Sequence, residues 1–305
     1  MIWFWPTVLR PVLEAARPST LVEVGAAGGH NTKNILDFAM EHGARVHVID
    51  PVPGFDVDGF QAKYGDHFIF HRCKSHEILA EIEAPDVVLI DGDHNWFTVY
   101  HELRLLGERA GRDGRPFPIT LMHDVSWPYA RRDMYYNPDD VPEEHRQPHR
   151  QANIVFGQSE LSDEQGINGG LHNALTEGGP RNGVLTAVEQ YIEEVPEPFV
   201  LRIVHGFSGL GMLAPAATLE AHPAVKEQFD RVMGAEFLFE HSRRLERIAI
   251  AGRSQASEAS RKLRRAEGSE RALKERVNRL EATADRLRER VEATTAAIDR
   301  LRARA

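Results

Sequence analysis

The chain has 305 residues, a net charge of −9 and a single cysteine, Cys73. This length accommodates one large domain and an appendage. One cysteine excludes an internal disulfide framework and a cysteine-rich zinc site. We expect a cytoplasmic enzyme.

The first residues, Met1 to Pro6, are apolar but too few for a membrane-spanning helix, and no basic leader accompanies them. We expect this segment to pack against the core, and an aromatic surface patch for a membrane or a partner remains the alternative. No other window approaches the length of a spanning helix, so we expect no membrane span.

The charge is distributed unevenly. Residues 241–305 hold 18 Lys and Arg against 10 Asp and Glu, a net of +8, which leaves −17 on residues 1–240. An acidic body repels phosphate backbones, so we expect no nucleic-acid partner.

A glycine-containing turn follows the first buried strand. Leu21, Val22 and Val24 form an apolar run that ends in a turn of small residues, and a helical pattern begins near Ile35. Gly25 and Gly29 bracket this turn, and glycine lets a ligand approach the backbone closely. The spacing differs from the G-x-G-x-x-G of dinucleotide-binding turns.

A second apolar strand, residues 45–49, ends at Asp50. An acid at this place in a doubly wound fold accepts hydrogen bonds from the ribose hydroxyls of a bound nucleotide. The alternative is that Asp50 only caps the next segment, since Pro51 follows it.

Two further apolar runs end in polar clusters. Residues 86–90 lead into Asp91, Gly92, Asp93 and His94, and residues 119–122 lead into His123 and Asp124. Because neighbouring parallel strands end at the same edge of a sheet, these side chains should converge there. Carboxylates favour Mg²⁺, and an imidazole among them favours Mn²⁺, Fe²⁺ or Zn²⁺. The alternative is that the acids cap loops and His123 bonds to the backbone.

The end of the domain shows a helix and a hairpin. Residues 184–192 have helical spacing, and the apolar runs 199–204 and 210–213 flank a glycine-containing loop. We therefore expect an α/β fold: a doubly wound, Rossmann-like, mostly parallel sheet whose last strand is antiparallel, followed by a C-terminal helical coiled coil.

The basic tail has an apolar repeat of alternating four- and three-residue steps, typical of a coiled-coil seam. The seam runs through Leu273, Val277, Leu280, Ala284, Leu287, Val291, Thr294, Ile298 and Leu301. Gly252 and Gly268 weaken the earlier part, so we expect a firm coil from about Arg271. The expected role is homo-oligomerisation or docking on a partner protein, and the alternative is a lone solvated helix.

We expect an α/β enzyme domain over residues 1–215 with an insertion at about 124–182, linking helices over 216–252, and a coiled coil over 253–305. The insertion is rich in aromatic and basic residues and has little apolar periodicity, which favours a substrate lid over a surface loop pinned by its own aromatics. Its candidate substrate residues are Trp127, Tyr129, Arg131, Arg132 and Tyr135.

Glu23 two residues before Gly25, and Thr32 three after Gly29, make the turn resemble that of class I S-adenosylmethionine-dependent methyltransferases. The order of this turn, Asp50, the Asp91-Gly-Asp-His motif and His123-Asp124 is similar to the metal-dependent O-methyltransferases that act on sugars, such as macrocin O-methyltransferase. The resemblance covers about residues 15–215.

The resemblance implies roles for particular residues. S-adenosylmethionine would bind at Glu23, Gly25, Ala26, Gly29, Thr32 and Asp50, with Asp91 and Gly92 near its ends. Ser75 joins this set because it follows the short apolar stretch 68–70. Mg²⁺ or Mn²⁺ would bind Asp91, His123 and Asp124, although His123 stands where the family has an acid. Asp93 is the family's candidate base, and His94 is a second candidate because histidine titrates near neutral pH. A structural role for His94 in the loop also remains open.

The expected function is therefore metal-assisted O-methylation of a hydroxyl on a sugar, polysaccharide or glycosylated metabolite. One alternative is an enzyme of the same fold with metal-dependent hydroxylase or N-methyl transfer chemistry. Another is a nucleotide-binding assembly protein that acts through its coil.

Overall fold

The structure is a computed structural model that describes residues 1–83 and 85–303, with Leu301 described by its backbone alone. It divides into a compact unit, Met1–Leu238, and a second unit, Phe239–Ala305, of which residues 304 and 305 lie outside the described part.

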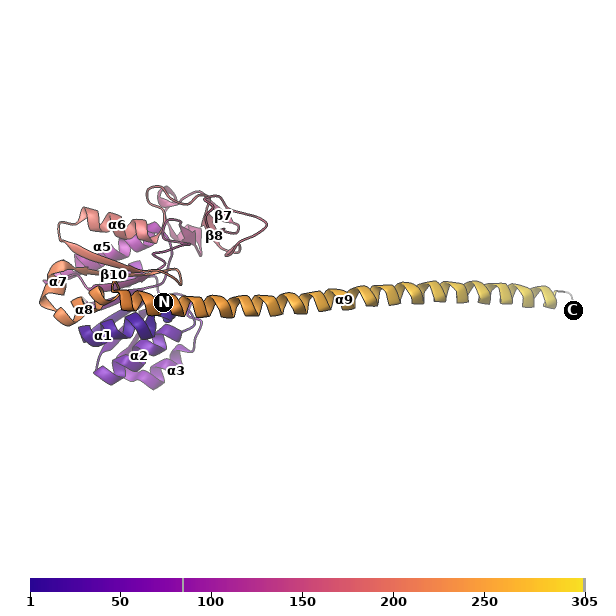
Figure 1. The fold of residues 1–305 in the computed structure, drawn as a ribbon, viewed down its shortest axis with the longest axis horizontal. Coiled ribbons are helices and arrows are strands. Elements are labelled where there is room, and N and C mark those ends of the chain that lie inside the picture. Colours follow the sequence, from indigo (N-terminus) through magenta and orange to yellow (C-terminus); the bar gives the residue numbers. More distant parts are fainter. Residues whose placement is uncertain (84, 304–305) are drawn as a thin grey trace. The chain divides into compact units, whose positions relative to one another are not determined.

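The compact unit is built on a seven-stranded sheet of order β3-β2-β1-β4-β5-β10-β9 (Figure 1). Its strands are β1 (Thr20–Val24), β2 (Arg45–Ile49), β3 (Phe68–His71), β4 (Val87–Ile90), β5 (Ile119–His123), β9 (Phe199–Val204) and β10 (Leu210–Pro215). The first five strands pair in parallel, and β10 runs antiparallel to both β5 and β9. The mostly parallel, Rossmann-like fold with an antiparallel last strand is confirmed.

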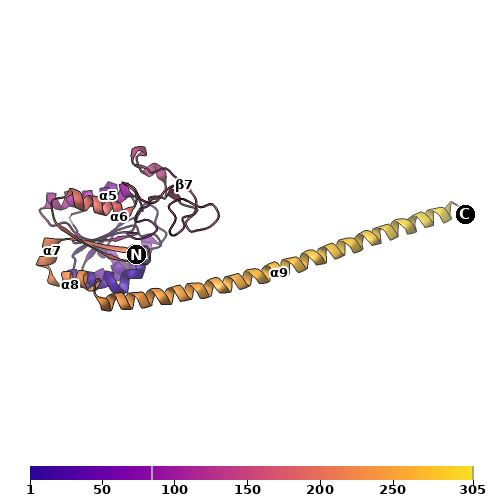
Figure 2. The same ribbon diagram turned by 45° about the horizontal axis from the view of Figure 1, so that its top comes forward.

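Helices cover both faces of this sheet, as Figures 1 and 2 show. The helices of the compact unit are α1 (Arg10–Ala16), α2 (His30–His42), α3 (Val57–Tyr64), α4 (Ser75–Ile78), α5 (Trp96–Asp113), α6 (Val184–Glu194), α7 (Ala216–Ala221) and α8 (Pro223–Arg231). One buried core lies under α1, α2 and α8, and a second lies under α5 and α6. Strands buried on both faces explain their continuous apolar runs.

The N-terminal segment packs into the first core as expected. It forms two short helical turns, η1 (Ile2–Phe4) and η2 (Trp5–Leu9). Phe4 is completely buried, whereas Trp3 is half exposed and stacks on Phe207 with ring centroids 5.3 Å apart. Among the described residues, no helix combines the length and the apolar character that crossing a bilayer requires.

The insertion between β5 and α6 is more regular than the sequence suggests. It holds a three-stranded antiparallel sheet of β6 (Met134–Tyr135), β8 (His172–Ala174) and β7 (His149–Gln151), and the short turns η4 (Pro138–Asp140) and η5 (Glu143–His145). Tyr129, Met134 and Ile154 form its own small core. The expectation of a segment without regular structure is therefore corrected: very short strands joined by long connections leave no periodic signal.

The second unit belongs to α9 (Ala235–Arg302), one continuous helix that includes both Gly252 and Gly268 (Figures 1 and 2). Helix formation over the seam agrees with the sequence, and the pairing of this helix in a coiled coil stays a prediction.

Candidate functional site

The turn after β1 is held against the end of β4. Gly25 has φ +85°, and a Cβ built on it would lie 2.3 Å from the carbonyl oxygen of Asp91 and 2.6 Å from Gly92 Cα. Gly29 has φ +74°, and its Cβ would meet the ring of Phe55. Only glycine fits these positions. The candidate cofactor turn and the candidate metal motif therefore touch through their backbones.

Asp50, at the end of β2, organises the same turn. Its Oδ2 accepts hydrogen bonds from the amides of Ala26 and Ala27, both at 2.9 Å, and its Oδ1 accepts one from Val52 at 2.8 Å. Asp50 thus caps the following segment, as the alternative interpretation held, and also lies at the expected nucleotide edge. Its ribose contact stays a prediction.

Two carboxyl groups are buried, one on β1 and one on α5. Glu23 accepts a hydrogen bond from Asn31 at 2.9 Å, and burial raises the pKa of Glu23 to about 7. Glu102, on α5, accepts a hydrogen bond from the Ser75 hydroxyl at 2.5 Å, and burial raises the pKa of Glu102 to about 8. Thr32 is buried on α2, so it lies within the domain interior. The sequence singled out Ser75 but missed its partner Glu102, because a glutamate on a helix normally faces solvent.

Asp91, His123 and Asp124 converge as the sequence predicts. His123 Nδ1 lies 3.0 Å from Asp91 Oδ1 and 2.8 Å from Asp124 Oδ2, and one donor atom from each residue lies within 4.8 Å of the others. Asp124 holds a left-handed backbone conformation, with φ +60°. The Met1 ammonium also lies 2.8 Å from Asp91 Oδ2.

The electrostatics of this cluster favour ionised groups. Burial opposes the charge on Asp91, but His123 lowers the pKa of Asp91 to about 2. Burial likewise opposes the charge on His123, but hydrogen bonds to Asp124 and Asp91 raise the pKa of His123 to about 9. The second nitrogen, His123 Nε2, bonds to the carbonyl of Phe207 at 2.7 Å. An imidazolium between two carboxylates therefore balances their charge when no cation is bound.

The two base candidates lie in different surroundings. His94 Nε2 is 3.3 Å from Asp124 Oδ2, and its ring lies 5.5 Å from Tyr129 and 5.8 Å from Tyr136. Asp93 accepts a hydrogen bond from Thr98 at 3.2 Å, and burial raises the pKa of Asp93. His94 thus faces the acidic cluster, whereas Asp93 faces α5.

The insertion's candidate substrate residues fall into two groups. Tyr129 borders His94, and Trp127 packs on Phe156, with ring centroids 5.3 Å apart. The other three stabilise the insertion itself: Arg131 pairs with Glu189, Arg132 donates to the carbonyls of Ala174 and Ser159, and Tyr135 donates to Asp133. Arg132 and Tyr135 are 1% exposed, so their burial disfavours contact with a substrate.

Tyr136 is not among the candidate substrate residues, yet its ring borders His94. It is 59% exposed, whereas its neighbour Tyr135 is buried. β6 ends at Tyr135, so Tyr136 lies in the connection that follows, where no strand periodicity in the sequence indicates which side chains are exposed.

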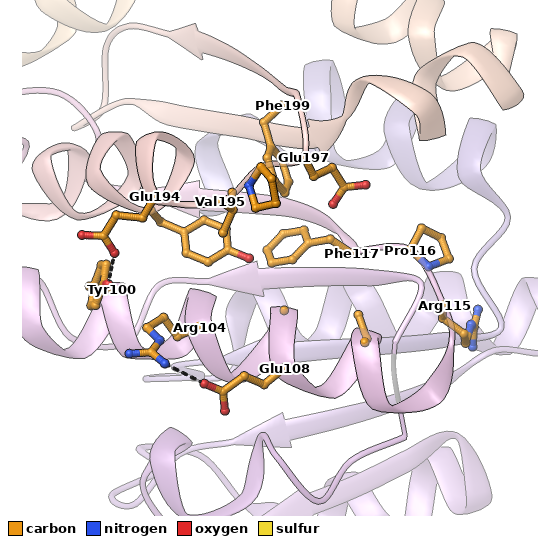
Figure 3. A pocket seen from close by; sticks show the side chains of 15 residues that line it. Tyr100, Arg104, Glu108, Arg115, Pro116, Phe117, Glu194, Val195, Glu197 and Phe199 are labelled. Atoms are coloured by element: carbon orange, nitrogen blue, oxygen red, sulfur yellow. Dashed lines mark hydrogen bonds and ion pairs between the residues drawn. The ribbon is translucent and has the colours of Figure 1, made fainter.

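A cavity of about 550 Å³ lies elsewhere, between α5, α6 and the start of β9 (Figure 3). Tyr191, Phe117 and Phe199 contribute its aromatic lining. Phe117 precedes β5 and Phe199 begins β9, so the cavity lies at the sheet edge opposite His123. It is therefore separate from the candidate site.

Residues 22–125 match a family model described as a methyltransferase domain. The match covers 104 of the 305 residues. The match spans the glycine turn, Asp50, Asp91 and Asp124, which are the elements of the candidate site. It confirms the enzyme class expected from the sequence, an S-adenosylmethionine-dependent methyltransferase. No curated protein sequence matches this chain significantly.

The methyltransferase domain also has similar solved structures at low identity. One is the 1,6-didemethyltoxoflavin-N1-methyltransferase of Burkholderia thailandensis, with 17% identity, 70% of this chain and 80% of that chain covered, and a TM-score of 0.37. Another is the Podospora anserina methyltransferase PaMTH1, with 12% identity, 68% and 76% covered, and a TM-score of 0.42. A third is a caffeoyl-CoA O-methyltransferase homologue from Staphylococcus aureus, with 9% identity, 68% and 81% covered, and a TM-score of 0.37.

Proposed function

We propose that this methyltransferase transfers the methyl group of S-adenosylmethionine to a hydroxyl of a sugar or a glycosylated molecule, with a divalent cation assisting. The contact of Gly25 with the Asp91-Gly92 backbone carries this proposal. It brings a cofactor bound at the turn next to the cluster of Asp91, His123 and Asp124, where a substrate oxygen would approach the methyl group.

The cofactor site comprises the residues expected from the sequence. Glu23, Gly25, Ala26, Gly29, Thr32 and Asp50 belong to the turn and its neighbours, and the backbone at Asp91 and Gly92 borders it. Asp50 still has acceptor capacity on its carboxylate for ribose hydroxyls. Ser75 is 7% exposed and would contact the adenine end.

The donor set fits a divalent cation. Asp91, His123 and Asp124 would hold Mg²⁺ or Mn²⁺, and His123 Nε2 already donates to a backbone carbonyl, as metal-bound histidines commonly do. A bound cation polarises a substrate hydroxyl and lowers its pKa. His123 would have to be unprotonated at Nδ1 to hold the cation, so the affinity for the cation would fall as the pH decreases.

His94 is the base that we favour over Asp93. Neutral Nε2 takes the hydroxyl proton, the substrate oxygen forms its bond to the methyl carbon, and the carbon–sulfur bond breaks to release S-adenosylhomocysteine. Asp124, 3.3 Å from Nε2, stabilises the resulting imidazolium. The exposed Tyr136 borders His94 and offers an aromatic face to a sugar ring, whereas Tyr129 is buried behind His94 and supports it.

The donor set disfavours the hydroxylase alternative. Non-haem iron oxygenases use two histidines and one carboxylate, whereas this set has one histidine and two carboxylates. We therefore favour methyl transfer.

The test is S-adenosylhomocysteine release from the purified protein with a panel of glycosides, with and without EDTA, followed by NMR of the product. We expect an O-methyl ether, and turnover that EDTA abolishes and Mg²⁺ or Mn²⁺ restores. Asp91→Asn and His123→Ala should lower kcat at least about a hundredfold. Asp163→Asn, an exposed change in the insertion, should leave it unchanged. EDTA-resistant turnover would contradict the role of the cation, and an N-methyl product would contradict the acceptor.

A further inference from the structure

An unpartnered apolar seam runs along α9. Leu273, Val277 and Leu280 begin it, and Leu287, Val291 and Ile298 continue it. These six side chains are between 45% and 64% exposed. An apolar stripe of this length on one helix is normally covered by a partner.

We propose that this seam binds the same seam of a second copy of the chain, in a parallel, in-register, two-stranded coiled coil. The proposal is independent of the catalytic function. The partner is a second copy of the chain, the number of strands is two and their direction is parallel.

The residue types at the seam indicate two strands. In heptad notation, the a positions are Val277, Ala284, Val291 and Ile298, and the d positions are Leu273, Leu280, Leu287 and Thr294. β-Branched residues at a, combined with Leu at d, favour a parallel dimer over trimers and tetramers. Three of the four a residues are β-branched, and three of the four d residues are Leu.

The flanking charges are complementary in a parallel dimer. In a parallel dimer each g residue faces the e residue of the following heptad on the other chain. Arg276 at g then faces Glu281 at e, and symmetry repeats this attractive pair. The next pairs, Thr283 with Arg288 and Arg290 with Thr295, are neutral, so residues 273–298 contain no pair of like charges in this arrangement.

The antiparallel arrangement places g residues opposite g residues and e residues opposite e residues. Glu281 at e can then face Arg288, whereas the g residues Arg276, Thr283, Arg290 and Ala297 offer no acid to either arginine. The apolar layers distinguish the two directions: a parallel dimer stacks the β-branched a residues on each other and the leucines at d on each other, which is the combination that favours two parallel strands. The seam residues therefore favour the parallel dimer for two copies of this chain.

A charge swap tests the pairing without weakening the helix itself. Within one helix Arg276 lies three residues before Arg279, and Glu281 lies four residues before Asp285, so both carry like-charge neighbours. Arg276→Glu and Glu281→Arg each turn one of these like-charge pairs into a pair of opposite charges. Any loss of dimer in these variants must then arise between chains.

We expect light scattering of the full chain to show two chains per particle. Each single swap should raise the dimer dissociation constant by about tenfold, since two attractive pairs become repulsive. The double variant Arg276→Glu/Glu281→Arg should restore it to the wild-type value, with unchanged helicity by circular dichroism. A monomer at every concentration, a trimer or tetramer, or a double variant as weak as the singles would overturn the proposal.

Disulfide formation tests the direction. In a Cys73→Ser background, Leu273→Cys should cross-link to an identical chain, because the two d positions meet near the start of the parallel seam. Glu275→Cys, at the outward f position of the same turn, is the matched control and should not cross-link. If Leu273→Cys chains cross-link only to Ile298→Cys chains, the helices are antiparallel and the proposal is wrong.

Discussion

At the scale of single residues, two glycines with similar backbone conformations distinguish the effect of backbone strain from the effect of steric contact. Gly25 and Gly43 have φ of +85° and +75°. A Cβ on Gly25 would collide with the Asp91 carbonyl, whereas a Cβ on Gly43 would meet nothing within 4 Å. Substitution of Gly25 should therefore disturb the close contact of the turn with Asp91 and Gly92, whereas substitution of Gly43 should not.

We expect Gly43→Ala to lower the free energy of unfolding by about 1 kcal/mol through its backbone conformation alone. Gly25→Ala should lower it by about 3 kcal/mol, because Asp91 and Gly92 must move as well. Urea unfolding measures both variants, and calorimetry should show that only Gly25→Ala loses S-adenosylmethionine. Equal effects of the two substitutions would contradict the close contact.

The buried Glu102 should make stability depend on pH. Its pKa is about 8 in the folded protein against about 4.5 unfolded, so the folded state holds its proton longer. Stability from this group is therefore full below pH 4.5 and falls as the pH rises from 4.5 to 8.

Glu102→Gln keeps an acceptor for Ser75 without the ionisation. The variant should match the wild type at pH 4 and exceed it at pH 8, by at most about 4 kcal/mol in unfolding free energy. Thermal melts across this range measure the difference. A difference that does not grow with pH would show that Glu102 ionises as freely in the folded chain as in the unfolded one.

The sequence predicted which residues lie together at the site better than it predicted which residues are buried. The sequence predicted the convergence of Asp91, His123 and Asp124, because strand ends share one sheet edge. It suggested substrate contact for Arg132 and Tyr135, which the structure buries, since an amphipathic side chain can face either way. Their orientation depends on contacts with Ala174 and Asp133, which are set by tertiary structure.

At the scale of elements, Asp133 joins three segments. It accepts hydrogen bonds from the amides of Trp96 and Gly183, both at 2.7 Å, and from Tyr135 at 2.8 Å. It thereby connects the insertion to the starts of α5 and α6. The amide of Met134 also bonds to the carbonyl of His94 at 2.9 Å, so the insertion is fixed directly on the Asp91-Gly-Asp-His motif.

Asp133→Ala leaves these buried donors without an acceptor and should lower the unfolding free energy by about 3 kcal/mol. We also expect faster limited proteolysis within the insertion and a lower kcat, because His94 loses its support. Asp163→Ala, which removes an exposed ion pair with Arg150 in the same insertion, is the control. If both variants are cleaved at the wild-type rate, Asp133 does not anchor the insertion.

The strands of the large sheet were predictable because each is a mostly apolar run of four to six residues. The small sheet of the insertion was not, since its strands have two or three residues and pair across long connections. The apolar pattern of the sequence determines the strands of the large sheet, whereas contacts between distant segments determine the short strands of the insertion.

At the scale of the whole molecule, the catalytic unit and the seam are distinct in sequence and in packing. The compact unit ends at Leu238 and contains both buried cores, whereas the seam begins at Leu273. A chain that ends at Glu270 should therefore keep its melting transition and its affinity for S-adenosylmethionine, and should be monomeric. Loss of cofactor affinity in this chain would show that the seam contributes to the site.

The central claim is that the turn at Gly25 and Asp50 binds S-adenosylmethionine beside a cation site. Calorimetric titration of S-adenosylmethionine into the full chain, with and without Mg²⁺ or Mn²⁺, tests it most directly. We expect a micromolar dissociation constant that Asp50→Ala abolishes and that Asp56→Ala, an exposed helix cap nearby, retains. Absence of binding with every cation, or equal binding by Asp50→Ala, would contradict the account.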